Sequence, residues 1–317
     1  MLKYIVKVIT QFIFVLFVVS ILIFVLIRLS PTDPVAVILG GHNTNAELIA
    51  NTRAKYGLDK SLIAQYFTWI GGFFTGDLGI GFKNQQDVGS LIASRLPITC
   101  GLVLIGTIIS LIVAIPLGVL AGARKNSMFD NVVSILSLVL VSVPPFVTAM
   151  IMIVILARVA PSFPITGGYS DVTTYLSRII FPCIALALPR ITLLLRVTRS
   201  GMTKQMDSNY VQAAIAKGLP ERIVIFKHAL RNAIIPVLSI IGIQVGGLIV
   251  NAVLVENIFS LSGIGTLLID SINSSDYPIV EDITLMLVFV FLLSSTVVDV
   301  LYGIIDPRVR NATREMR

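Results

Sequence analysis

Long apolar runs without charged residues alternate with short polar segments along the chain. About 18 or more consecutive apolar residues can cross a bilayer as a helix, and four runs are long enough: 8–27, 96–123, 131–157 and 232–255. Two weaker runs are 179–195, which contains Arg190, and 283–298, which continues past Asp299 to residue 305. The pattern predicts an all-α integral membrane protein with six transmembrane helices.

The composition agrees with this prediction and adds a detail about the first helix. Hydrophobic residues make up 56% of the chain and charged residues 13%, whereas a soluble domain carries about 25% charged residues. The first apolar run is longer than a signal-peptide core, and no small-residue cleavage site follows it. The apolar run ends instead at polar and proline residues, namely Arg28, Pro31, Asp33 and Pro34. We therefore expect the first helix to be retained in the mature protein.

The distribution of basic residues predicts the orientation. An even number of spans places both termini on one side, and cytoplasmic loops carry an excess of Lys and Arg. With the termini inside, the inner segments hold 15 of the 24 basic residues, while the outer loop 256–282 has five acids and no base. We therefore expect both termini to be cytoplasmic. The net charge of +7 is then a topology signal, and nucleic-acid binding is a poor explanation for it.

The residues that carry chemistry are sparse and scattered. Cys100 and Cys183 have no CxxC spacing and read as packing residues, and His42 and His228 are far apart in sequence. No phosphate-binding loop of the GxxxxGK[ST] type occurs. We therefore predict no catalytic residue, no metal site and no cofactor bound by this chain.

A hydrophilic insertion, residues 31–95, separates the first two spans. Residues 47–56 read as a short helix ending at Gly57, and residues 61–74 as a helix rich in aromatic side chains, which favour a membrane boundary. A mere connector is the alternative, but the segment is too long for one. We expect an extracytoplasmic cap.

The polar segment 196–232 lies between the fourth and fifth spans. A helix is predicted to begin at residues 207–209, with Gln212 and Asn209 in a capping-box relation. Gly218 can end that helix in a left-handed conformation, and Pro220 fits the first turn of a second helix. An amphipathic helix resting on acidic lipid is the alternative. The alanines of the first helix make a narrow face that suits a protein partner better than lipid.

Candidate pathway residues lie where polar or helix-breaking groups fall at membrane depth. Such polar groups usually face the bundle interior, and proline frees backbone carbonyls that must meet protein or water. The candidates are Ser142, Pro144, Pro145, Phe146, Gln244 and Asn251. For the prolines helix packing is favoured over a gate. For Gln244 and Asn251 a pathway role and an interhelical hydrogen bond are equally favoured. Arg190 should face protein or water because lipid exposure is costly.

The polar segment resembles the cytoplasmic coupling motif of ABC-importer permeases, in which Glu-Ala-Ala, three residues and Gly follow one another. Here the motif reads Gln212-Ala213-Ala214 and Gly218, with Gln in place of Glu. His228–Asn232 and Pro236 look like the branch that imports dipeptides, oligopeptides and nickel. Further matching pieces occur in order: 28–34, 56–59, 76–79, 115–118, 142–146, 255–259, 263–265 and 306–308. The N-terminal insertion points to the B-type subunit.

The resemblance implies a type I permease fold in the bacterial cytoplasmic (inner) membrane. Segment 1–30 would hold the N-terminus and first helix, 31–95 the insertion, 96–305 the permease core and 306–317 a cytoplasmic tail. It also implies a heterodimer with a paralogous C-type permease, two cytoplasmic ATPase subunits that use ATP and Mg, and an extracytoplasmic solute-binding protein. The chain itself would be non-catalytic. Residues implied to contact an ATPase are Gln212, Ala213, Ala214, Lys217, Gly218, Leu219, Glu221 and Arg222.

Other classes of protein fit the sequence less well. A secondary transporter would need intramembrane carboxylates for ion coupling, and an intramembrane protease would need a paired catalytic set within the spans. A non-transporting scaffold or sensor subunit bound to an ATPase stays open. Peptide is the favoured cargo on the family's commonest use, with nickel, a metal chelate and haem as alternatives.

Overall fold

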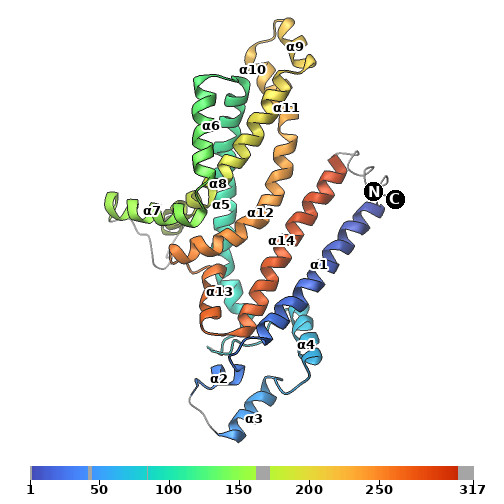
Figure 1. The fold of residues 1–317 in the computed structure, drawn as a ribbon, viewed down its shortest axis with the longest axis vertical. Helices are drawn as coiled ribbons and strands as arrows, with labels where there is room; N and C mark the ends of the chain where they lie inside the picture. Colours follow the sequence, from blue (N-terminus) through green and yellow to red (C-terminus); the bar gives the residue numbers. More distant parts are fainter. Residues whose placement is uncertain (1, 42–44, 84, 162–171, 306–317) are drawn as a thin grey trace. The chain divides into compact units, whose positions relative to one another are not determined.

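The computed structural model describes residues 2–41, 45–83, 85–161 and 172–305. Regular structure in these ranges is helical, and the β pairing is an isolated bridge between Ile80 and Asp87. The longer helices (Figure 1) are α1 Leu2–Arg28, α3 Ala46–Lys55, α4 Leu62–Thr75, α5 Val88–Ala123, α6 Met128–Val141, α7 Pro145–Val159, α8 Val172–Met206, α9 Asn209–Ala216, α12 Ile235–Ile258, α13 Ile264–Asn273 and α14 Tyr277–Ile305. The shorter ones are α2 Pro34–Ile38, α10 Glu221–Ile223, a π-helical turn η1 Val224–Ala229 and α11 Leu230–Ala233.

Several helices can cross a membrane. Within the described residues α1, α5, α8 and α14 are each long and apolar enough, and α6 with α7 makes a fifth if the two form one span. In α12 the apolar stretch Gly246–Ile258 is shorter than these spans. The membrane-spanning, all-helical class is therefore confirmed, whereas the count of six stays a prediction.

The break that Pro144 and Pro145 predict within the third span, 131–157, is confirmed. The span is divided into α6 and α7, which meet at a bend of 99°. Pro144 has an extended backbone with ψ 149°, and Pro145 opens α7. A proline cannot donate the helical hydrogen bond, and it disfavours helical geometry at the residue before it. Two consecutive prolines therefore end one helix and begin another.

The first of two compact units contains residues 1–99 and 262–317. In it α1 packs along α14, and α4 lies against α1 (Figure 1). The Tyr66 ring on α4 meets Phe24 of α1 edge-on at a centroid distance of 5.5 Å, and its hydroxyl is 2.8 Å from Ser20 Oγ. The helix predicted at 61–74 is thus confirmed, and its Tyr66 side chain packs against α1.

Buried acidic groups at the start of α14 hold this unit together. Glu281 pairs with Arg28 of α1, and Asp282 accepts a hydrogen bond from Trp69 Nε1 at 2.8 Å. Asp276 accepts from the backbone N–H groups of Phe82 and Lys83 at 2.7 and 3.1 Å. The sequence placed these acids in an outer loop ending at residue 282. The structure instead includes Glu281 and Asp282 in a helix that begins at Tyr277.

Replacing Trp69 by phenylalanine should lower the stability of the first unit. Phenylalanine keeps most of the ring but removes the Nε1–H donor to the buried Asp282 carboxylate. A buried acceptor left without its partner costs about 1–3 kcal/mol. The measurement is the thermal midpoint of the detergent-solubilised protein. Phe67→Leu, an exposed position on the same helix, is the control, and equal midpoints for the two variants would contradict the role of the hydrogen bond.

The second unit, residues 100–261, is built around α8. Helices α6, α7 and α12 pack against α8. Pro189 inside α8 cannot donate to the carbonyl of Ala185, and the Thr148 hydroxyl of α7 donates to that carbonyl at 3.3 Å. Arg190 is buried and donates to the Gln244 carbonyl of α12, so the expectation that it faces protein is confirmed.

The two cysteines differ from each other. Cys183 is fully buried in α8, as expected of a packing residue, and its thiol lies 3.8 Å from the carbonyl oxygen of Leu102. Cys100 is exposed on α5, so the prediction that both are packing residues holds only for Cys183.

Candidate functional site

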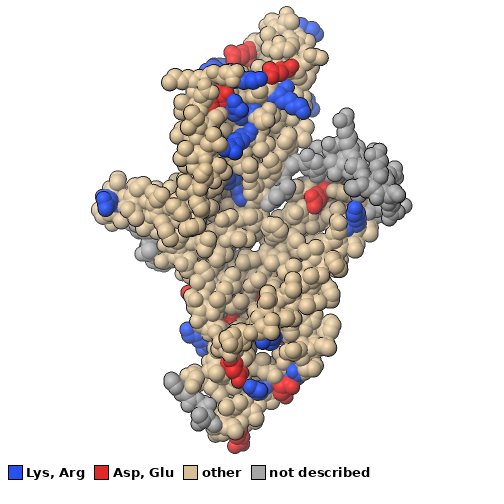
Figure 2. Space-filling model, in the orientation of Figure 1, with Lys and Arg blue, Asp and Glu red and all other residues tan. Residues whose placement is uncertain are grey.

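The candidate site is the segment 207–223, which we name the coupling segment. It joins α8 to η1, α11 and α12 in the second unit and contains α9 and α10 (Figure 1). Charged side chains gather over this end of the unit (Figure 2). The coupling segment therefore lies at a charged end of a group of apolar helices.

The start of α9 differs in detail from the prediction. Ser208 is the N-cap residue, and no side chain caps the helix there. Gln212 is therefore one position beyond the capping-box site, and its Nε2 donates to the Met206 carbonyl at 2.9 Å. The predicted capping box with Asn209 is wrong, because the helix begins one residue earlier than that register requires.

The end of α9 agrees with the prediction. Gly218 has φ +76°, a left-handed conformation that glycine adopts without steric cost. The Gly218 N–H donates to the Ile215 carbonyl at 2.9 Å, and the Leu219 N–H donates to the Ala214 carbonyl at 3.3 Å. These are the two bonds of a Schellman motif. Pro220 is the N-cap residue of α10, one position before the first turn in which it was predicted. The order of helix, sharp turn and second helix is confirmed.

Beyond α10 the second helix changes its winding. Residues Val224–Ala229 form a π-helical turn, which is rare and often found at functional sites. Val224, Ile225 and Ala229 from this turn are all buried. The sequence predicted a continuous helix into the fifth span and gave no signal for the wider turn.

A shared core fixes the coupling segment to its supporting helices. Ala214 is only 7% exposed and packs in one cluster with Val211, Met202 of α8 and Val119 of α5. Val224, Ile225, Ala229 and Ala233 complete that cluster. Ala214 is therefore a packing residue in this structure, and its implied contact with an ATPase stays a prediction.

The other implied contact residues share one property, which is exposure. They are Gln212, Ala213, Lys217, Gly218, Leu219, Glu221 and Arg222. The structure also exposes apolar side chains that the prediction missed, namely Ile215, Ile223 and Phe226, the last at 58%. Ile215, Leu219 and Ile223 lie on α9, in the turn after Gly218 and on α10, so no helical periodicity links them and their exposure had no signal in the sequence. The exposed face is thus broader and more apolar than a narrow alanine face.

The candidate pathway residues fall into two groups. Ser142, Pro144, Pro145 and Phe146 lie at the bend between α6 and α7, where the Ser142 hydroxyl donates to the Leu138 carbonyl at 2.9 Å. Gln244 and Asn251 lie two turns apart on α12, and Asn251 Nδ2 donates to the Gly247 carbonyl of its own helix at 2.8 Å. Helices α7 and α12 are in contact. The pathway role of both groups stays a prediction.

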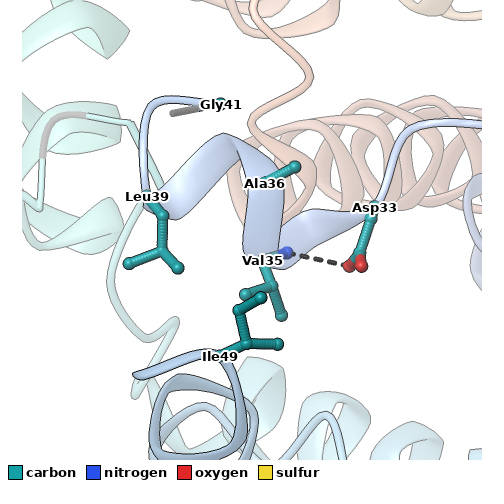
Figure 3. A pocket seen from close by; sticks show the side chains of 6 residues that line it. All are labelled: Asp33, Val35, Ala36, Leu39, Gly41 and Ile49. Atoms are coloured by element: carbon teal, nitrogen blue, oxygen red, sulfur yellow. Dashed lines mark hydrogen bonds between the residues drawn. The ribbon is translucent and has the colours of Figure 1, made fainter. Parts of the chain in front are cut away.

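A small pocket lies between α2 and α3 in the first unit (Figure 3). Its lining is mostly apolar and consists of Asp33, Val35, Ala36, Leu39, Gly41 and Ile49. Asp33 accepts from the Val35 N–H at 3.0 Å and pairs with Arg53 at 2.8 Å. The Asp33 carboxylate therefore caps α2, and the pocket offers no set of reactive groups.

Comparisons with known proteins match both parts of the chain to membrane components of one kind of transport system. Residues 114–311 match the family described as binding-protein-dependent transport system inner membrane component. Residues 1–103 match the N-terminal family of membrane components of the same systems.

Individual relatives match over nearly the whole chain. A di/tripeptide transport system permease protein of Pseudomonas aeruginosa is 35% identical, covering 92% of this chain and 94% of the relative. Dipeptide transport system permease proteins of Lactococcus lactis and Escherichia coli are 35% and 33% identical, covering 98% and 92% of this chain and 100% and 94% of the relatives. The chain therefore belongs to the family of inner membrane components of binding-protein-dependent transport systems.

Proposed function

We propose that this chain is one of two paired permease subunits of an ATP-driven importer of peptides. The observation that carries the proposal is the coupling segment, a short helix and a sharp turn that rest on a core shared with α5 and α8 and expose a mixed apolar and charged face. Such a face suits a protein groove. Because the coupling segment packs on the transmembrane helices α5 and α8, a force applied to the segment can move those helices.

The remaining parts of the machine follow from this role. A paralogous permease forms the other half of the pathway, and two cytoplasmic ATPases bind ATP and Mg. An extracytoplasmic binding protein delivers the cargo. In this role the chain is non-catalytic, and its lack of a phosphate loop of the usual type leaves ATP binding by that route to the partner subunits. Both termini and the coupling segment are cytoplasmic, in agreement with the excess of Lys and Arg in those segments.

Peptide cargo is supported by the relatives. The three permeases described above are named for transport of dipeptides or tripeptides, and the match covers both the insertion and the core. Selection among peptides belongs to the binding protein that delivers them. The transmembrane helices of this chain form part of the translocation pathway and open or close it.

The test is uptake of a labelled dipeptide by proteoliposomes that contain the complete complex. Uptake should require ATP inside, the binding protein outside and an ATPase with an intact phosphate loop. Uptake driven by an ion gradient without ATP would overturn the importer assignment. ATP hydrolysis without transport of any peptide would instead support a sensor subunit, and transport of nickel or haem alone would overturn the cargo.

A further inference from the structure

The turn between α5 and α6, residues 124–127, lies against the junction of α8 and α9. This turn is separated from the coupling segment by about 80 positions in sequence, yet the turn and the flanking ends of α5 and α6, residues 118–130, make four different contacts with residues 198–207. All of them lie within the second unit. The contacts decide which helices must follow the coupling segment when it moves.

The first contacts are between backbones. A Cβ placed on Gly118 of α5 would lie 2.6 Å from Thr198 Cβ, and one placed on Gly122 would lie 2.6 Å from the Arg199 carbonyl oxygen. The Thr203 hydroxyl donates to the Gly122 carbonyl at 3.3 Å. Glycines four residues apart allow two helices to pack at this close range. The ends of α5 and α8 are therefore fitted to each other.

The central contact is an ion pair between a buried carboxylate and a partly exposed arginine. Asp130, on the first turn of α6, is fully buried. Its Oδ2 accepts from one Arg199 terminal nitrogen at 2.7 Å and from the Asn126 backbone N–H at 3.0 Å, and its Oδ1 accepts from Arg199 Nε. A two-pronged pair fixes both distance and orientation. The same carboxylate thus holds the turn, the start of α6 and the end of α8.

An exposed pair marks the other side of the junction. Lys125 Nζ lies 3.3 Å from Asp207 Oδ2, immediately before the N-cap of α9, and both side chains are more than half exposed. Exposed pairs of this kind contribute little. The Lys125–Asp207 pair therefore adds little rigidity to the contact between the turn and α9. The pair of Asp130 and Arg199 supplies the rigidity. The exposed pair can thus serve as the control when the other pair is tested.

We propose that Asp130 and Arg199 are positioning residues that make α6 move as one body with α8 and the coupling segment. A push on α9 then reaches α6 directly and arrives at the bend at residues 142–144, rather than passing only along the chain through α8 and α12. Neither residue touches cargo or nucleotide. The proposal rests on the proposed function, because it describes how the ATP-driven movement of the coupling segment is transmitted to the transmembrane helices.

The first test measures coupling in the reconstituted complex. Asp130→Asn and Arg199→Gln should each lower the ratio of peptide transported to ATP hydrolysed by about tenfold. Arg199→Gln leaves the buried Asp130 charge without its partner, and Asp130→Asn removes the charge that holds the partly exposed Arg199 in place. The double variant should recover part of the loss, since it removes both charges. Lys125→Gln should stay within about twofold of the parent. An unchanged ratio in both single variants, or equal losses in all four variants, would overturn the proposal.

The second test follows the motion itself and needs no peptide. Spin labels at Met128→Cys on α6 and Asn209→Cys on α9, both exposed and outside the implied contact residues, are attached in a background with Cys100→Ser. The distance between the labels should be the same without nucleotide and with trapped ATP, and adding Asp130→Asn should make it differ between the two states. A distance that changes in the parent would overturn the single moving body. Failure of peptide uptake with a constant distance would overturn the cargo assignment only.

Discussion

Gly218→Trp should abolish ATP-driven uptake while leaving the chain inserted in the membrane at its normal level. Gly218 is exposed at the turn between α9 and α10, and a Cβ placed there meets no atom of this chain within 4 Å. The indole ring therefore should not clash with other atoms of this chain. The space that it fills is where the proposed ATPase groove must close on the turn, and a bulky ring there prevents docking.

Backbone strain has to be separated from this steric effect. At φ +76° a residue with a Cβ costs about 1–2 kcal/mol, and asparagine tolerates the left-handed region better than most residues. Gly218→Asn is therefore the matched control and should keep most of the uptake. The measurements are uptake in proteoliposomes and co-purification of the ATPase with the permease. Normal uptake by the tryptophan variant, or equal loss in both variants, would contradict docking at this turn.

The parts of the site that could be predicted are those fixed by neighbours in sequence. Gly218 and Pro220 specify a turn by their own backbone preferences, so the end of α9 and the start of the next helix followed from the sequence. The burial of Ala214 could not be foreseen in this way. It depends on Val119 and Met202, which lie on α5 and α8, and a short alanine-rich helix has no hydrophobic pattern strong enough to show which face is inside.

The same distinction holds for the fold. Apolar runs located the spans, because length and the absence of charge are enough to identify them. The bend of 99° between α6 and α7 had a sequence signal in Pro144 and Pro145, but its size depends on how α7 packs against α8 and α12. The ion pair between Asp130 and Arg199 had no signal, since the two residues are 69 positions apart.

Gly122→Leu should strongly destabilise the second unit. A Cβ at this position would lie 2.5 Å from Met202 Cβ and 2.6 Å from the Arg199 carbonyl oxygen. These atoms belong to the α8 backbone or lie next to it, so they cannot give way by a simple rotation, and the helices must separate. Overpacking of this kind costs about 1–3 kcal/mol or more. The expected result is a lower thermal midpoint of the solubilised protein and less protein in the membrane.

Gly71→Leu is the matched control, because the same substitution on α4 places a Cβ with nothing within 4 Å. Leucine is also the better helix former, so this variant should be as stable as the parent or slightly more so. A Gly122→Leu protein with an unchanged midpoint would show that α5 and α8 are not fitted at this point. Because α8 leads into the coupling segment, Gly122→Leu should lower stability and uptake together. Gly218→Trp should lower uptake alone, and this difference between the two variants separates packing beneath the segment from docking on it.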